Sequence, residues 1–289
     1  MTSEGFLFPI PMSLKAFRQI LLNASVLPDD IHHSMKQILL ITALFCGAGL
    51  NTLSADDGFK PLFDGKTLKG WKSAHSKGEG DWGPFRIDPE QKAIHVYKGD
   101  KAGSKQSSDC LYTEKAYSKY ILKLEYKWLD KRFAPREDHD RDAGLLFHVH
   151  GDLTKVWPLS LEMQIGETPA ERMGKKRYHT GDLFVLGKNL RCKTNKTKNI
   201  YDPKGPLVPT RSCPTILGVE KPKGEWNEMQ IVVDGAKKAT FILNGKVVHE
   251  IRDMAREVDG KMIPLDKGRI ALQAEWAELM YRNIVIKEL

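Results

Sequence analysis

The sequence predicts an all-β fold, a two-sheet antiparallel jelly-roll sandwich of one domain. From residue 56 onward, apolar and polar side chains alternate with a period of two, and turns rich in Gly, Pro and Asp separate the short apolar runs. Asn244-Gly245 lies between two such runs and is a dipeptide favoured in tight β-hairpins. Only 169–173 and 251–256 resemble short helices, so a βαβ fold is not expected.

The candidate strands are rich in β-branched and aromatic residues. In chain order they are 120–128, 145–150, 160–165, 183–186, 227–234, 239–243, 246–250, 269–275 and 280–287. The segment 187–223 has few strand signals. We therefore expect it to be a long loop that covers the mouth of a site.

The amino-terminal region predicts a secretory signal peptide over residues 35–55. Met35-Lys36-Gln37 is followed by an apolar run and then by Asp56-Asp57. A run of about 13 apolar residues is too short to cross a bilayer core of roughly 30 Å. Residues 1–34 are interpreted as an extension before the true start at Met35. The mature chain, 56–289, is therefore expected to be secreted or periplasmic, with no membrane span.

Composition excludes several classes of protein. The chain has 289 residues, of which 41% are hydrophobic and 28% charged, and this excludes disorder, collagen and coiled coil. Its net charge of +8 is scattered, so no nucleic-acid partner is expected. The mature chain keeps Cys110, Cys192 and Cys213, at spacings that match no zinc or haem motif. A disulfide between Cys192 and Cys213 is possible but is not predicted. It would cross-link the segment that contains the basic stretch 188–204.

Three candidate strands carry unusual polar rows. Side chains two apart share a face of a strand, so the polar residues in 145–150, 160–165 and 269–275 lie opposite apolar core residues. These polar residues are His148, His150, Ser160, Glu162, Gln164, Gln273 and Glu275. A solvated strand face is normally polar, which is the simpler interpretation. However, Glu and Gln have weak β preference. If the three strands share a sheet, the rows form one surface suited to hydrogen-bonding sugar hydroxyls.

The chain resembles the 3-keto-disaccharide hydrolase domain family over residues 58–289. The resemblance rests on an ordered series of short motifs rather than on any one of them. They are GFKPLFDGKTL at 58–68, GW at 70–71, AGLLFH at 143–148, KVWPLSLEMQ at 155–164, GDLF at 181–184, GEWN at 224–227, LNGK at 243–246, LQAE at 272–275 and YRNI at 281–284. Asp142-Ala143 stands where the family often has Asn-Ser, and Tyr281 where Phe is usual. Neither departure touches Glu162 or Gln164.

The resemblance implies a concanavalin A-like jelly roll that acts on glycosides oxidised to a ketone at C3 of the sugar. Such a ketone acidifies the C2 proton, so a base can form an enolate, which expels the C1 substituent before water adds. Direct hydrolysis by a pair of carboxylates is the competing mechanism. A non-catalytic carbohydrate-binding module is the alternative function, since jelly rolls host lectins as readily as enzymes.

Glu162 is the first candidate for the catalytic acid or base, and Glu275 is the second carboxylate. Glu275 could instead be a rim residue paired with Arg282, which could also stabilise an enolate or bind substrate. Gln164 and Gln273 are expected to bind hydroxyls or the carbonyl of the sugar. Trp157 lies near a strand end and offers a flat apolar face for a sugar ring.

His148 and His150 have the spacing of two metal ligands on one strand. Asp182, Glu162 or His179 could supply a third ligand, and a divalent cation would stabilise an enolate. Without a metal, His148 is a catalytic or hydrogen-bonding candidate, and His150 and Asp182 are substrate-binding candidates. No cofactor is required by the sequence, and a divalent metal stays open. The charged segment 136–142 lacks the glycine spacing of an EF-hand, so it is interpreted as a solvated hairpin end.

Overall fold

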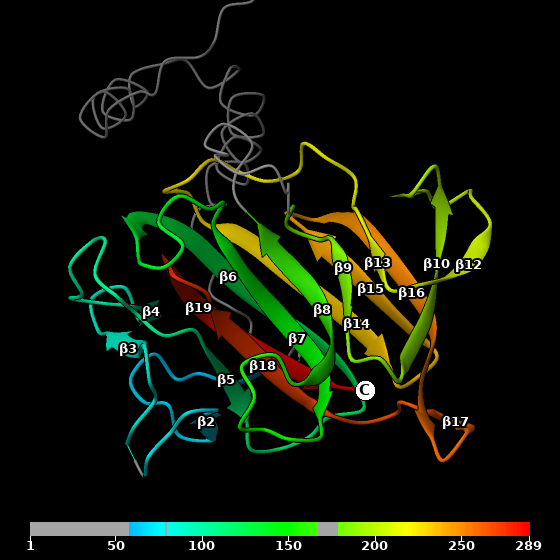
Figure 1. Ribbon diagram of the computed structural model, residues 1–289, viewed down its shortest axis with the longest axis horizontal. Coiled ribbons are helices and arrows are strands. Elements are labelled where there is room, and N and C mark those ends of the chain that lie inside the picture. Colours follow the sequence, from blue (N-terminus) through cyan, green and yellow to red (C-terminus); the bar gives the residue numbers. More distant parts are fainter. Residues whose placement is uncertain (1–57, 79, 167–178) are drawn as a thin grey trace, which may run out of the picture. The chain divides into compact units, whose positions relative to one another are not determined.

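A computed structural model describes residues 58–78, 80–166 and 179–289, which form strands and turns with no helix among them (Figure 1). Residues 58–289 make one compact unit. The predicted extension 1–34, the signal peptide 35–55 and the helical candidate 169–173 lie outside the described residues. In the described part of the chain, no helix is long and apolar enough to span a membrane.

The larger sheet has twelve strands in the order β11-β10-β16-β15-β14-β6-β19-β4-β3, with β12 on β10, β17 on β16 and β1 on β19. Its strands are β1 (Lys60–Pro61), β3 (Phe85–Asp88), β4 (Ala93–Val96), β6 (Lys119–Arg132), β10 (Leu190–Thr197), β11 (Ile200–Tyr201), β12 (Leu207–Thr210), β14 (Asn227–Asp234), β15 (Lys238–Leu243), β16 (Lys246–Val258), β17 (Lys261–Pro264) and β19 (Ala277–Glu288).

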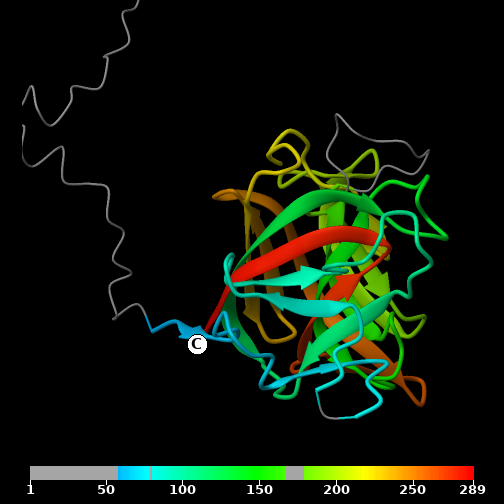
Figure 2. The ribbon, with the colours of Figure 1, turned by 90° about the vertical axis from the view of Figure 1, so that its left-hand side faces the viewer.

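The smaller sheet has seven strands in the order β13-β9-β8-β7-β18-β5-β2. They are β2 (Trp71–Ser73), β5 (Asp109–Thr113), β7 (Asp142–His150), β8 (Leu159–Gly166), β9 (Leu183–Leu186), β13 (Ser212–Cys213) and β18 (Arg269–Ala274). Neighbouring strands pair antiparallel in both sheets. The two sheets lie face to face (Figure 2), so the predicted antiparallel sandwich is confirmed.

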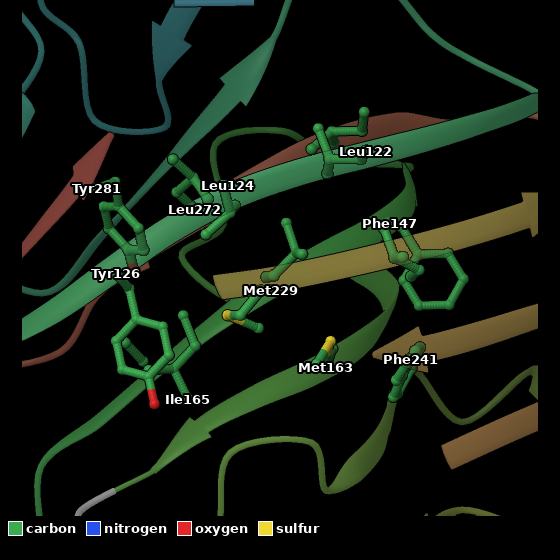
Figure 3. Packing of buried hydrophobic residues seen from close by; sticks show 14 of the residues in the cluster. Leu122, Leu124, Tyr126, Phe147, Met163, Ile165, Met229, Phe241, Leu272 and Tyr281 are labelled. Atoms are coloured by element: carbon green, nitrogen blue, oxygen red, sulfur yellow. The ribbon is translucent and has the colours of Figure 1, made fainter. Parts of the chain in front are cut away.

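The core fills the space between the sheets (Figure 3). One inward face of each strand supplies it because side chains alternate along a strand. The residues labelled in Figure 3 are Leu122, Leu124, Tyr126, Phe147, Met163, Ile165, Met229, Phe241, Leu272 and Tyr281, all fully buried or nearly so. Burying a side chain of this size contributes about 1.5–3 kcal/mol. This packing fixes which side chains of the smaller sheet point outward.

Each of the nine candidate strands is a strand in the structure, and Asn244-Gly245 forms the turn between β15 and β16. The helical candidate 251–256 is wrong, because it lies inside β16. Asp253 has a φ of +52°, and the pairing of β16 with β10 shifts register beside it. This bulge places Ile251 and Met254 in the core three residues apart, a spacing that imitates a helix.

The expected loop over 187–223 is also corrected, since it contains β10, β11, β12 and β13. β10 extends the larger sheet beside β16, and β13 extends the smaller sheet beside β9. The disulfide left open between Cys192 and Cys213 is not formed. Cys192 Sγ donates to the carbonyl of Thr210 (3.7 Å) and Cys213 Sγ to that of Pro214 (3.6 Å).

Candidate active site

A cavity of about 210 Å³ opens on the outer face of the smaller sheet, the face turned away from the core. Its lining comes from β7, β8 and β9, from the residue after β18, and from the segments before β7 and β8. The lining residues are Arg136, Asp142, Trp157, Glu162, Gln164, Phe184, Leu186 and Glu275. The three strands that carry the polar rows do lie in one sheet, where β8, β7 and β18 are neighbours.

Glu162 lies on the cavity wall with only 4% of its surface exposed. Leu161 and Met163 on either side are in the core, so alternation turns Glu162 outward. The Glu162 carboxyl makes no hydrogen bond to the described residues. Burial raises the pKa of Glu162 well above its usual range, and the nearby carboxyls of Glu275 and Asp142 raise it further. Glu162 is therefore suited to carry a proton.

Glu275 lies in the same cavity but has partners for both carboxyl oxygens. Trp157 Nε1 donates to Oε1 at 2.8 Å, and Arg136 Nη1 donates to Oε2 at 3.2 Å. Burial raises the pKa of Glu275, while these two contacts oppose the rise by stabilising the carboxylate. The surroundings of the two glutamates therefore differ, with Glu275 the better candidate for the ionised form.

The sequence-based pairing of Glu275 with Arg282 is wrong. Arg282 lies on β19 in the larger sheet, where its Nε donates to Glu125 Oε2 at 2.6 Å. Its guanidinium also packs over the ring of Trp226, 3.8 Å from the centroid. Arg282 is not among the residues that line the cavity. The arginine that pairs with Glu275 is Arg136 and not Arg282.

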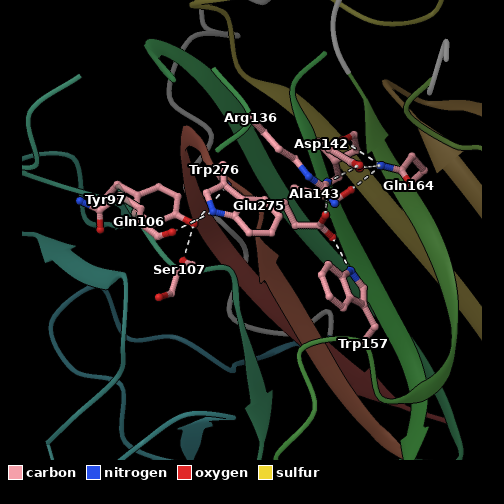
Figure 4. A network of polar contacts seen from close by, with 11 residues as sticks. Tyr97, Gln106, Ser107, Arg136, Asp142, Ala143, Trp157, Gln164, Glu275 and Trp276 are labelled. Atoms are coloured by element: carbon pink, nitrogen blue, oxygen red, sulfur yellow. Dashed lines mark hydrogen bonds and ion pairs between the residues drawn. The ribbon is translucent and has the colours of Figure 1, made fainter. Parts of the chain in front are cut away.

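Arg136 is positioned by an aromatic ring and by two carboxylates (Figure 4). Its guanidinium lies 4.4 Å from the ring centroid of Trp276, and Nη1 lies 3.7 Å from Asp142 Oδ2 in addition to its contact with Glu275. Trp276 is itself fixed, because its Nε1 donates to the carbonyl of Gln106 at 2.9 Å. These contacts hold one positive charge among the carboxyl groups of the cavity.

Gln164 and Asp142 are linked across β8 and β7. Gln164 Nε2 donates to Asp142 Oδ1, and also to the carbonyl of Ala143 at 2.8 Å. Burial and the charge of Glu275 raise the pKa of Asp142. Because the Gln164 amide nitrogen is engaged within the sheet, its carbonyl oxygen is the atom left to accept a hydrogen bond from a ligand.

Gln273 is completely buried and is not among the residues that line the cavity. A β-carbon on Gly144, in the neighbouring strand β7, would lie 2.3 Å from Gln273 Oε1 and 2.0 Å from Glu162 Oε1. A side chain at position 144 would therefore require both of these side-chain ends to shift. Gln273 and Glu162 share the outer face, as the alternation predicts.

His148 is not on the outer face, so that part of the prediction is wrong. It is fully buried, has a φ of +51°, and its Nε2 lies 3.1 Å from the carbonyl of Gly235, which follows β14 of the larger sheet. The register of β7 shifts between Phe147 and His150, and Val149 instead packs with the outer-face residue Leu146. This bulge interrupts the alternation. Burial lowers the pKa of His148 to about 4, so it stays neutral.

Neither His150 nor Asp182 is among the cavity-lining residues. His150 Nδ1 lies 2.8 Å from the carbonyl of His148. Asp182 Oδ1 accepts from the backbone N–H of Thr215 at 2.8 Å, and Oδ2 accepts from that of His179 at 2.9 Å. Asp182 thus connects the backbone at Thr215 with the backbone at His179. Among the described residues, no three His, Cys, Asp or Glu side chains are grouped to hold a metal ion.

The structure adds residues that the sequence analysis missed. Arg136 and Asp142 come from the segment interpreted as a solvated hairpin end, yet both line the cavity. The sequence does contain a signal for Asp142. Asp142 precedes Gly144 by two residues and Leu146 by four, and residues at even spacing along a strand share one face, which here is the outer face of β7. For Arg136 there was no such signal, because it lies in a turn outside any strand.

The chain is similar to one protein family and to several solved structures. The family model of the 3-keto-alpha-glucoside-1,2-lyase-like domain matches residues 58–287. A candidate glycosyl hydrolase from Parabacteroides distasonis shares the fold with a TM-score of 0.52 and 18% identity, covering 83% of this chain and 98% of that chain. A second candidate glycosyl hydrolase from that organism gives a TM-score of 0.47 and 20% identity, covering 80% and 99%.

The carbohydrate-binding module CBM66 from Bacillus subtilis gives a TM-score of 0.43 and 10% identity, covering 76% of this chain and 96% of that chain. No curated protein matches the sequence. The family match spans most of the chain and includes Glu162, Gln164 and Glu275. The chain therefore belongs to the family of 3-keto-alpha-glucoside-1,2-lyase-like domains.

Proposed function

We propose that this protein is a secreted or periplasmic enzyme that cleaves the glycosidic bonds of 3-keto-glycosides, including disaccharides. The observation that carries the proposal is the pair Glu162 and Glu275, which share one cavity but differ in their contacts, since only Glu275 is hydrogen-bonded by Trp157 and Arg136. Two carboxyls whose environments push their protonation apart are suited to act as acid and base. The family match supports a sugar substrate, and the predicted signal peptide 35–55 supports export.

In the proposed first step, the Glu275 carboxylate removes the proton from C2 of the sugar. The electron pair of that C–H bond forms an enolate with the C3 ketone. Arg136, 3.2 Å from Glu275 and fixed against Trp276, places a positive charge where the negative charge moves from carboxylate to enolate oxygen. The preorganised guanidinium needs no rearrangement at that moment.

In the second step the enolate collapses to an enone and breaks the C1–O bond. Glu162, protonated in its buried position, gives its proton to the departing alkoxide, which leaves as an alcohol. Water then adds across the C1–C2 double bond, with its oxygen bonding to C1 and a proton returning to C2 from Glu275. The net reaction is hydrolysis, and both carboxyls regain their starting protonation once a proton passes from the added water to Glu162.

The test is aglycone release by residues 56–289 from a chromogenic 3-keto-glucoside, run beside the same glucoside left unoxidised and with divalent cation added to parallel samples. We expect release from the keto form alone, because only a C3 ketone acidifies the C2 proton. Release from the plain glucoside at a similar rate would indicate direct hydrolysis by the carboxylate pair. Release from neither, together with retained sugar binding, would favour the non-catalytic binding module.

A further inference from the structure

The side chain of Gln273 is an unusual buried group. None of its surface is exposed, and neither Nε2 nor Oε1 has a hydrogen-bond partner among the described residues. Buried amides are nearly always paired, because an unpaired donor and acceptor lose their water without compensation. Gln273 therefore destabilises the protein unless a buried water molecule or a ligand group pairs with it.

The position of Gln273 Oε1 shows what kind of group could pair with it. Gln273 Oε1, from β18, and Glu162 Oε1, from β8, approach the same point above Gly144 in β7. Glu162 lines the cavity, and Gln273, which is not among the lining residues, lies directly behind the Glu162 carboxyl. The protonated Glu162 carboxyl still offers one acceptor oxygen, and Gln273 offers an acceptor in Oε1 and a donor in Nε2.

We propose that Gln273 and Glu162 form a subsite that binds one hydroxyl group of the sugar. A hydroxyl both donates and accepts, so it can donate to an acceptor oxygen of the pair and accept from Gln273 Nε2. A cation would leave that N–H unpaired, and a carboxylate or phosphate would face Glu162 and Glu275. This inference rests on the proposed function, since it names how the same cavity recognises a neutral sugar.

The test is Gln273→Leu, which keeps the side chain buried but removes both polar atoms. We expect KM for the chromogenic 3-keto-glucoside to rise about 10-fold to 100-fold, because the sugar hydroxyl then enters a site without a partner. We also expect the unfolding temperature to stay equal or rise, because an unpaired buried amide is replaced by apolar surface. Gln230→Leu, on the outer face of the larger sheet, is the matched control and should leave KM unchanged.

Two results would overturn the subsite. One is an unchanged KM with a lowered unfolding temperature in Gln273→Leu, which is the result expected if Gln273 only holds a resident water or its neighbours. The other is an unchanged KM in a folded Gly144→Ala variant, whose added methyl group must displace the ends of both Gln273 and Glu162. Gly144→Ala also serves if Gln273→Leu does not fold.

Binding to the subsite can be measured without any catalytic turnover. A negative result for the subsite is therefore distinguishable from a negative result for the proposed reaction. The probe is D-glucose at high concentration. We expect it to raise the unfolding temperature of the wild-type protein and of Gln230→Leu, with the rise lost in Gln273→Leu. No rise in the wild type, or an equal rise in all three proteins, would overturn the inference whether or not 3-keto-glycosides are cleaved.

Discussion

Replacing Glu162 with glutamine is expected to lower kcat/KM for a 3-keto-glycoside by about 10²–10⁴-fold when the leaving group is an alcohol. Glutamine fills the same space but cannot give a proton to the departing alkoxide. The loss should be much smaller when the leaving group is an acidic phenol, which departs without help. A series of 3-keto-glucosides with leaving groups of different acidity measures this difference directly.

Glu162→Gln should be less active than the wild type but more stable to unfolding. Because the pKa of Glu162 is raised in the folded state, folding loses stability as pH rises from the ordinary glutamate pKa towards the raised one. The variant lacks this loss, so its unfolding temperature should exceed that of the wild type increasingly across that pH interval. Glu228→Gln, exposed on β14, is the matched control for both measurements. An equal loss of activity for all leaving groups would contradict the acid role.

Replacing Glu275 with glutamine is expected to lower kcat/KM by a comparable factor, about 10²–10⁴-fold, but for every leaving group alike. The reason is that Glu275 acts before the C1–O bond breaks, on the C2 proton. Its buried position raises its pKa, so the wild-type activity should fall as pH decreases through a value above the usual 4.5. The pH profile of kcat/KM measures this fall in activity at low pH, which we call the acidic limb. The residual activity of Glu275→Gln should not show it.

Arg136 provides the control that links this limb to Glu275. Arg136 Nη1 stabilises the carboxylate at 3.2 Å, so Arg136→Gln should move the acidic limb to higher pH. Arg282→Gln removes a charge of the same kind from the larger sheet and should leave the limb where it is. A limb that stays fixed in Arg136→Gln would contradict the assignment of Glu275 as the base.

Alternation predicted much of the fold and part of the site. On β8 and β18 the pattern holds without interruption, so Glu162, Gln164 and Gln273 were assigned to the correct face from the sequence. It failed at His148 on β7 and at Asp253 on β16, where a bulge adds one residue and a positive φ. The bulge at His148 is coupled to a distant contact, because Gly268 lies against the His148 backbone too closely to carry a β-carbon.

The residues around Glu275 could not be predicted, because their contacts are not local. Arg282 is seven residues from Glu275, but β18 and β19 belong to different sheets, and Trp276 with a φ of +59° marks the crossing between them. Arg136 is 139 positions away and reaches Glu275 only once β7 and β18 pair. Polar contacts made by turns depend on the assembled sheet, which alternation along one strand does not specify.

The central claim is that cleavage begins with removal of the C2 proton, and isotope exchange tests it most directly. A 3-keto-glycoside is cleaved by the wild-type enzyme in deuterated water, and the product is compared with substrate incubated for the same time without enzyme or with Glu275→Gln. The account predicts deuterium at C2 of the enzymatic product, well above both controls. A product that keeps only its original hydrogen at C2, together with an undiminished rate of cleavage for substrate deuterated at C2, would contradict it.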